Sequence, residues 1–415
     1  MTTKDRSQKD LLCRHFGAQG WYVQPEVPVF HQGGVHEQQK PITDIDVLAL
    51  RPGLDLRWDL VLGDCKTLRG QSPVNRSIWL RGLMEHFSAS SGIIVLRHGR
   101  PIEPDHMLFA ASLGISLVEE SEFKFYDQAA LYPGGSADYR ISVRELTEIR
   151  ELPERYPRLE SLCEYIYQLA WNEKNRLELL RRVIGEAQSV AREIDPSRPE
   201  HLALTLDTVG VFTIGLAECV GTIFSQYLRP ETLEQLDDAL KMLIWGGRSQ
   251  YLFVAKLRHD LMVAKGKELG SSGALALPAW DRFLQLVRSM LEYPKLAFSV
   301  PQLLQRAAIE AYHEQPFLSH TTYSDLLLLK YSMLAATYFC RAANLPLQTG
   351  TLLEDKFIRR QSQLVHLHRL PDSSQAEEAI KEQSEELDHQ QLRIEGLQEP
   401  PVHATEVSPG GESTA

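Results

Sequence analysis

Apolar residues in the first part of the chain switch repeatedly between the three-to-four spacing of helices and the short runs of strands. The expected helices cover about 8–17, 78–87 and 106–113. The expected strands cover about 21–30, 42–50, 60–67, 92–97 and 114–118, with a turn at 51–53 between the second and the third. This alternation predicts an α/β domain over residues 1–130.

From about 139 to 370 the pattern becomes almost entirely helical, as in Leu159, Leu162, Ile166 and Leu169. Helix breaks are expected at 195–199, 246–247, 270–273 and 299–301, and no repeat of fixed period is present. The sequence therefore predicts an irregular all-α domain. Beyond it, residues 371–415 form an acidic tail, with a polar helix expected up to about 397 and disorder after it.

Charged residues interrupt two of the apolar strands. Asp44 and Asp46 are two positions apart in one strand, and Asp64 and Lys66 are two apart in the next. Side chains at i and i+2 share a face of a strand, so neighbouring strands would bring three carboxylates and one ammonium together. Burying such charges is costly unless they pair or bind metal. A carboxylate cluster for a divalent cation beside a lysine indicates phosphodiester hydrolysis.

The acid at Asp46 followed by Asp64-Cys65-Lys66, within this order of helices and strands, resembles the PD-(D/E)xK nuclease superfamily. The resemblance covers about the first 125 residues and implies a restriction-endonuclease-like fold, with a mixed central sheet flanked by helices. It implies that Asp46, Asp64 and Lys66 are catalytic. It also implies that Asp46, Asp64 and the backbone carbonyl of Cys65 bind Mg²⁺, with Mn²⁺ as a substitute.

Further ligands are less defined. The first helix lacks the family's additional glutamate, and its nearest acid is Asp10. Glu26 on the first strand and Asp44 are the alternatives. Arg69, Arg76 and Arg81 follow the motif and are expected to hold the phosphate backbone of a nucleic acid.

Composition adds little to this interpretation but does not oppose it. The net charge of −11 comes mostly from the tail, where eleven acidic residues face two basic ones. Five cysteines form no C-x-x-C pair, which is typical of a reducing cytoplasm. The polar start predicts no signal peptide. The apolar stretch at 201–227 contains Asp207 and Glu218, so we expect a buried helix and no membrane association.

The sequence thus predicts a Mg²⁺-dependent endonuclease acting on nucleic acid, with DNA as the expected substrate. Fold-level analogy points to defence against foreign DNA or to DNA processing. The helical domain is expected to bind a partner or a second copy. Two alternatives are a catalytically silent DNA-binding module and a scaffold or regulatory protein that acts through its helical domain.

Overall fold

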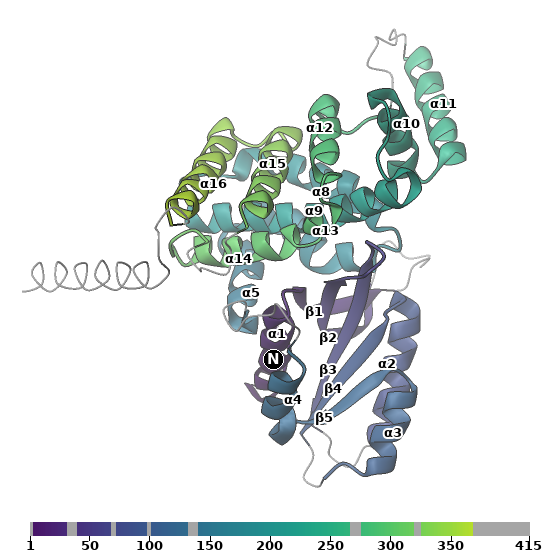
Figure 1. Ribbon diagram of the computed structural model, residues 1–415, viewed down its shortest axis with the longest axis vertical. Helices are drawn as coiled ribbons and strands as arrows, with labels where there is room; N and C mark the ends of the chain where they lie inside the picture. Colours follow the sequence, from purple (N-terminus) through teal and green to yellow (C-terminus); the bar gives the residue numbers. More distant parts are fainter. Residues whose placement is uncertain are drawn as a thin grey trace, which may run out of the picture. The chain divides into compact units, whose positions relative to one another are not determined.

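The structure, a computed structural model, describes residues 3–30, 40–67, 72–97, 101–131, 140–265, 275–318 and 325–367 (Figure 1). Residues 1–361 form one compact unit, which includes the predicted α/β domain and nearly all of the predicted helical domain. Residues 362–415 form a second unit. The predicted tail and the expected break at 270–273 lie outside the described residues.

The amino-terminal elements confirm the predicted order of helices and strands. They are α1 (Thr3–Ala18), β1 (Tyr22–Phe30), β2 (Pro41–Pro52), β3 (Trp58–Thr67), α2 (Pro73–Phe87), β4 (Ser91–Arg97), α3 (Pro104–Ser112), β5 (Ile115–Glu119) and α4 (Phe123–Ala129). The five strands form one sheet in the order β1-β2-β3-β4-β5. β1, β2 and β3 are antiparallel neighbours, whereas β3, β4 and β5 are parallel, so the sheet is mixed.

Helices cover both faces of this sheet, with α1 and α4 on one side and α2 and α3 on the other (Figure 1). Side chains of β3 alternate between the two faces. Gly63 faces α1, where an added Cβ would lie 2.8 Å from the Leu12 Cδ1 atom. Cys65 is buried among the same α1-side residues, which confirms that its side chain points to a packed face. Asp64 therefore points to the α2 side.

Side chains from the helical part satisfy the open edge of β1. The Gln305 side chain accepts a hydrogen bond from the Val23 N–H and donates one to the Val23 carbonyl, at 3.2 and 2.8 Å. The Asn172 side chain likewise bonds the Pro28 carbonyl and the Phe30 N–H, at 2.8 and 3.1 Å. An edge strand must be covered because its unpaired backbone groups otherwise recruit other strands. The helical part therefore completes the sheet.

The remaining elements are mostly helical, as predicted. The longer ones are α5 (Val143–Arg150), α8 (Leu179–Ser189), α9 (Pro199–Tyr227), α10 (Leu233–Ile244), α11 (Arg248–Ala264), α12 (Trp280–Met290), α14 (Val300–Tyr312), α15 (Leu326–Ala342) and α16 (Leu347–Leu367). Shorter ones are α6 (Leu152–Arg155), α7 (Glu160–Glu164), η4 (Tyr165–Leu169), η5 (Ala170–Asn172), η6 (Arg176–Glu178) and α13 (Pro294–Ala297). The expected break at 246–247 falls between α10 and α11, whereas those at 195–199 and 299–301 overlap the first residues of α9 and α14.

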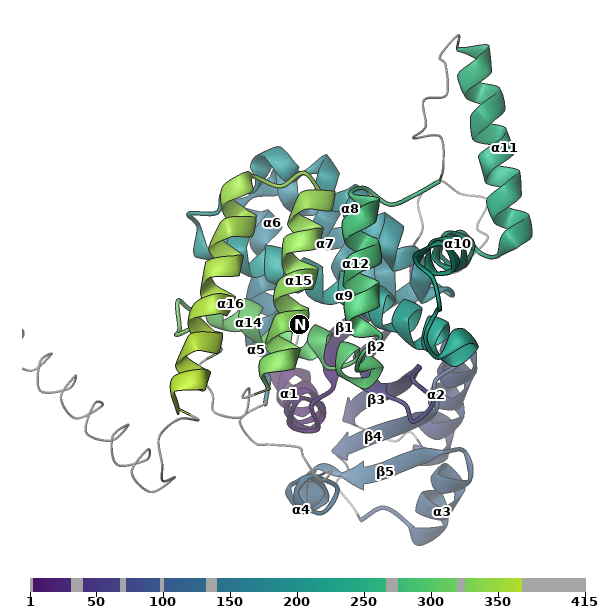
Figure 2. The same cartoon turned by 45° about the horizontal axis from the view of Figure 1, so that its top comes forward.

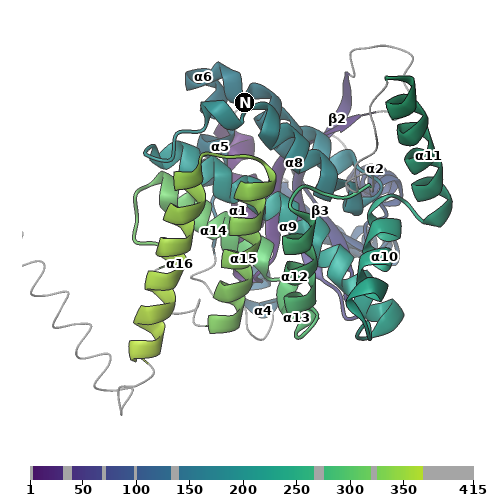
Figure 3. The same ribbon diagram turned by 90° about the horizontal axis from the view of Figure 1, so that it is seen from above.

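α9 is the central helix of this part and packs against α8, α13 and α14 (Figure 3). By length and composition it is the one described helix that would suffice to cross a membrane, and 78% of its most apolar window is buried. A core helix passes the same test. α11 differs, because none of its residues is buried and it lies at the margin of the helical part (Figure 2).

The hairpin between β2 and β3 is held against α9 and α13. The Trp58 indole N–H donates to the Ile214 carbonyl at 2.9 Å, and its ring centroid lies 4.8 Å from that of Phe298. At the tip, the Leu56 carbonyl oxygen comes so close to Gly221 that a Cβ there would lie 2.1 Å from it. Glycine at 221 is what permits this approach.

A buried carboxylate also joins the sheet to the helices. Asp207 of α9 is 2% exposed and accepts hydrogen bonds from the hydroxyls of Tyr167 and Tyr22, at 2.7 and 3.4 Å. Burial raises the pKa of Asp207 to about 6, although both hydroxyls oppose this shift. The charged form is therefore disfavoured in the folded protein.

This raised pKa makes folding stability depend on pH in a defined direction. The folded-state pKa lies above the unfolded one, so the stability present below about pH 4 is lost as the pH rises through about 6. In Asp207→Asn this dependence is absent. From pH 4 to 8 the unfolding free energy of the variant should gain about 2–3 kcal/mol relative to the wild type. Urea unfolding at several pH values measures this difference, and a constant difference would contradict it.

Candidate metal and phosphate site

Asp46 and Asp64 meet where the β2–β3 ladder ends. The last backbone pair is Val47 with Gly63, and the two aspartates are the next residues on their strands. The Cys65 N–H donates to Asp46 Oδ2 at 2.7 Å, which fixes the Asp46 carboxylate beside β3. The negative charge of Asp46 acts directly on Asp64. The structure therefore brings together the two acids that the sequence placed at the centre of the site.

Glu26 of β1 is the next acidic residue across the sheet from Asp46. It lies between Pro25, which pairs with Val47, and Val27, which pairs with Ile45, so it stands opposite Asp46. Its φ of 55° is in the left-handed region, which is unusual for a glutamate. Backbone strain of this kind concentrates at functional sites. Glu26, Asp46 and Asp64 thus occupy neighbouring positions on three adjacent strands.

Lys66 and Asp44 extend the site toward solvent. Lys66 is exposed at the end of β3 and, two residues from Asp64, shares its face of the sheet. Asp44 is exposed near the start of β2, and its charge acts on Arg76 together with those of Asp64 and Asp46. The site is therefore buried at Asp64 and open at Lys66.

Arg76 of α2 holds both oxygens of Asp64 with one edge of its guanidinium. Its Nε donates to Asp64 Oδ2 at 2.5 Å, and its Nη2 donates to Asp64 Oδ1. The guanidinium also stacks on Trp79, 3.6 Å from the ring centroid. Asp64 is 1% exposed, and burial raises its pKa to about 6 against the opposing effect of Arg76. We predicted that Arg76 holds phosphate, and in the structure a phosphate has to compete with this carboxylate for it.

Lys9 of α1 is a member of the site that sequence analysis missed. Its buried ammonium lies 2.8 Å from Asp46 Oδ1 and 3.0 Å from Glu26 Oε1. Burial alone would lower the pKa of Lys9, but Asp46 and Glu26 raise it above its usual range. No motif marks this lysine, because only the packing of α1 on the sheet brings it to the acids. The spacing in the sequence contains no signal for it.

The other predicted residues lie elsewhere or outside the described part of the chain. Arg81 pairs with Glu85 on the exposed side of α2 and donates to the Leu113 carbonyl. Asp10 accepts from the Val143 N–H at 3.0 Å and pairs with Arg14, so it does not join the acids. Arg69 lies outside the described residues.

The donors of this site fit a hard divalent cation. Among the described residues there is no group of three or more His, Cys, Asp or Glu side chains placed to hold a metal. Mg²⁺, however, takes only one or two protein carboxylates besides water and substrate oxygens. Asp46, Asp64 and the Cys65 carbonyl are such a set. A cation bound there would replace part of the charge that Lys9 and Arg76 now supply.

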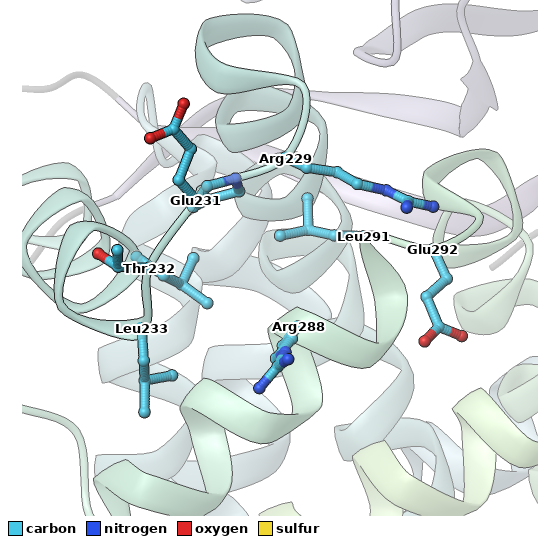
Figure 4. A pocket seen from close by; sticks show the side chains of 9 residues that line it. Arg229, Glu231, Thr232, Leu233, Arg288, Leu291 and Glu292 are labelled. Atoms are coloured by element: carbon cyan, nitrogen blue, oxygen red, sulfur yellow. The ribbon is translucent and has the colours of Figure 1, made fainter.

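A separate pocket of about 280 Å³ lies in the helical part, between α10 and α12 (Figure 4). Arg229 and Arg288 are among its lining residues, but so are Glu231 and Glu292. Equal numbers of positive and negative side chains give this pocket no preference for either sign of ligand.

Comparisons with protein-family models, with curated proteins and with solved structures find no match for this chain.

Proposed function

We propose that this protein is a metal-dependent endonuclease of the restriction-endonuclease-like class, with DNA as its substrate. The observation that carries the proposal is the meeting of Asp46 and Asp64 at the end of the β2–β3 ladder, with Lys66 on the same face as Asp64. The sheet supports it further, because antiparallel strands followed by parallel ones and flanked by helices are the arrangement that the resemblance implies.

The side chains of the site have separate tasks in this proposal. Asp46 and Asp64, with the Cys65 carbonyl, would hold Mg²⁺ or Mn²⁺, which when bound would stabilise charge on the phosphate oxygens. The Cys65 N–H keeps the Asp46 carboxylate in place. Lys66 neutralises the charge that develops on the phosphate as water adds and one P–O ester bond breaks. Arg76, which pairs with Asp64 in the structure, would bind a phosphate oxygen of the substrate.

A cleavage assay tests this proposal. Linear, circular and single-stranded DNA, and RNA, are incubated with Mg²⁺, Mn²⁺ or EDTA. We expect metal-dependent cleavage that Lys66→Gln reduces about 10²–10³-fold, as for removal of one transition-state charge donor. Asp64→Asn should reduce it at least as much. Asp59→Asn is the matched control, because Asp59 lies on the same strand but pairs with Arg51 at the surface.

The outcomes separate the two leading functions. Cleavage that survives in both Lys66→Gln and Asp64→Asn would place the activity at another site. The alternative of a silent DNA-binding module is favoured by one observation, namely that Lys9 and Arg76 already compensate Asp46 and Asp64. If that module is the function, wild-type protein binds DNA equally well with Mg²⁺ and with EDTA and does not cut.

The setting of the proposed nuclease follows from the rest of the chain. All five cysteines are buried free thiols, which supports action in the cytoplasm.

Cutting both strands of a duplex requires two sites, so we extend the proposal to a second protein chain held through the helical part. Exposed apolar residues on α11, such as Leu252, Phe253 and Leu257, support this extension.

A further inference from the structure

A cleft of about 320 Å³ opens on the α2 side of the sheet, between β2 and the helical part. Leu48, Leu50 and Leu60 form its floor. Trp171 of η5 and Phe87 at the end of α2 add aromatic surface. The volume is within the range of small-molecule sites, which combine apolar walls with a few polar groups. A flat, largely apolar group such as a nucleobase fits this lining.

Two of the polar side chains that line the cleft are cationic. Lys174, which is exposed, and Arg176 line it, and His86 lies at its α2 side. Glu173 is the one acidic residue in the lining, and its carboxylate pairs with Arg182 at 2.6 Å.

Arg176 is half-buried in this lining. Across the described ranges, its guanidinium makes no hydrogen bond or ion pair, although the charge of Glu218 acts on it. Burial lowers the pKa of Arg176 despite Glu218. The Glu218 Oε2 atom is itself buried without a hydrogen-bond partner, so Glu218 acts on Arg176 through its charge and not through a hydrogen bond. A half-buried guanidinium that makes no hydrogen bond can donate to an anionic ligand.

The cleft lies on the same face of the sheet as the proposed nuclease site. Leu48 follows Asp46 by two residues on β2, a rise of about 7 Å. Asn172 lines the cleft and also bonds the carbonyl of Pro28, the residue that pairs with Asp44. The Leu48 end of the cleft is therefore the end nearest to Asp46.

We infer that this cleft is a nucleotide-binding site, in which the base lies over Leu48, Leu50 and Leu60 and a phosphate is bound by Arg176 and Lys174. The inference rests on the proposed function for its choice of a nucleotide as the anionic aromatic ligand. It adds a subsite that the acid–lysine motif does not contain. Both a nucleotide unit of the substrate strand and a free nucleotide have this chemistry.

Calorimetric titration of the full-length protein with deoxyadenosine 5′-monophosphate in EDTA tests the site without any cleavage. Deoxyadenosine without phosphate is the paired probe. We expect the monophosphate to bind more tightly than the nucleoside. Arg176→Gln and Lys174→Gln should each weaken it about tenfold or more, since a charge-assisted hydrogen bond is lost. Arg181→Gln is the control, because Arg181 is near in sequence but stacks on Trp245 outside the cleft.

Lys174 is exposed, so Lys174→Gln keeps the test valid if Arg176→Gln fails to fold. Absence of binding by the wild type, or affinity unchanged in both cleft variants, would overturn the inference. A single-stranded oligodeoxynucleotide distinguishes the two sources. Tighter binding of the strand than of the mononucleotide, lost in the same variants, assigns the cleft to the substrate, whereas equal affinity assigns it to a free nucleotide. The titration contains EDTA and measures binding alone. Its result therefore does not depend on whether Asp64→Asn abolishes cleavage.

Discussion

Gly221→Ala is expected to destabilise the protein by about 3 kcal/mol or more. The new Cβ would lie 2.1 Å from the carbonyl oxygen of Leu56 and 3.0 Å from the Phe298 ring. The clashing atom belongs to the backbone of the β2–β3 hairpin, so the overlap is relieved only by moving the hairpin away from α9. That movement would also strain the hydrogen bond from Trp58 to Ile214.

Gly185→Ala is the matched control for this substitution. Gly185 also lies inside a helix, α8, but nothing comes within 4 Å of an added Cβ. Alanine is the better helix former, so this variant should gain about 0.5–1 kcal/mol. Chemical unfolding of both variants measures the two effects, which have opposite signs. Equal changes of unfolding free energy in the two variants would show that close contact between the hairpin and α9 is not what makes Gly221 necessary.

Arg76→Ala is expected to cost about 3–5 kcal/mol of unfolding free energy in EDTA at pH 8, because it leaves Asp64 buried and unpaired. The loss should shrink toward pH 5. Burial already raises the folded-state pKa of Asp64 to about 6, and removing Arg76 raises it further, so the penalty is present above this pKa and disappears as the carboxyl takes a proton.

Arg81→Ala provides the comparison on the same helix. Arg81 makes an exposed pair with Glu85, one turn away, and its removal should change stability by about 0.5 kcal/mol or less. Urea unfolding of both variants in EDTA and in Mg²⁺ measures the difference. If the acids bind a cation, Mg²⁺ restores stability to Arg76→Ala more than to the wild type. Equal stability of the two variants in EDTA would contradict the role assigned to Arg76.

The sequence predicted the sheet and the two central acids because both depend on local spacing. Strand alternation put Asp64 on one face and Cys65 on the other, and the structure confirms both orientations. The resemblance added the expectation that the strands around Asp46 and Asp64 are neighbours, which they are.

What the sequence did not predict depends on contacts between distant elements. Lys9 reaches Asp46 because α1 packs across the sheet, and the residues near Lys9 in the sequence do not indicate that packing. The pairing of Arg76 with Asp64 required knowing which way α2 faces. The sequence also did not predict which side chains of the helical part cover β1, since Gln305 lies 282 positions after Val23.

That last separation has a consequence for synthesis on the ribosome. All five strands are complete at Glu119, yet the side chain that covers the edge of β1 at Val23 belongs to Gln305. At a synthesis rate of about 5–20 residues per second, Gln305 is added to the chain roughly 10–40 s after Glu119. During this interval the edge of β1 is open to pairing with another nascent chain. Protection from aggregation is therefore needed most while the helical part is still being translated.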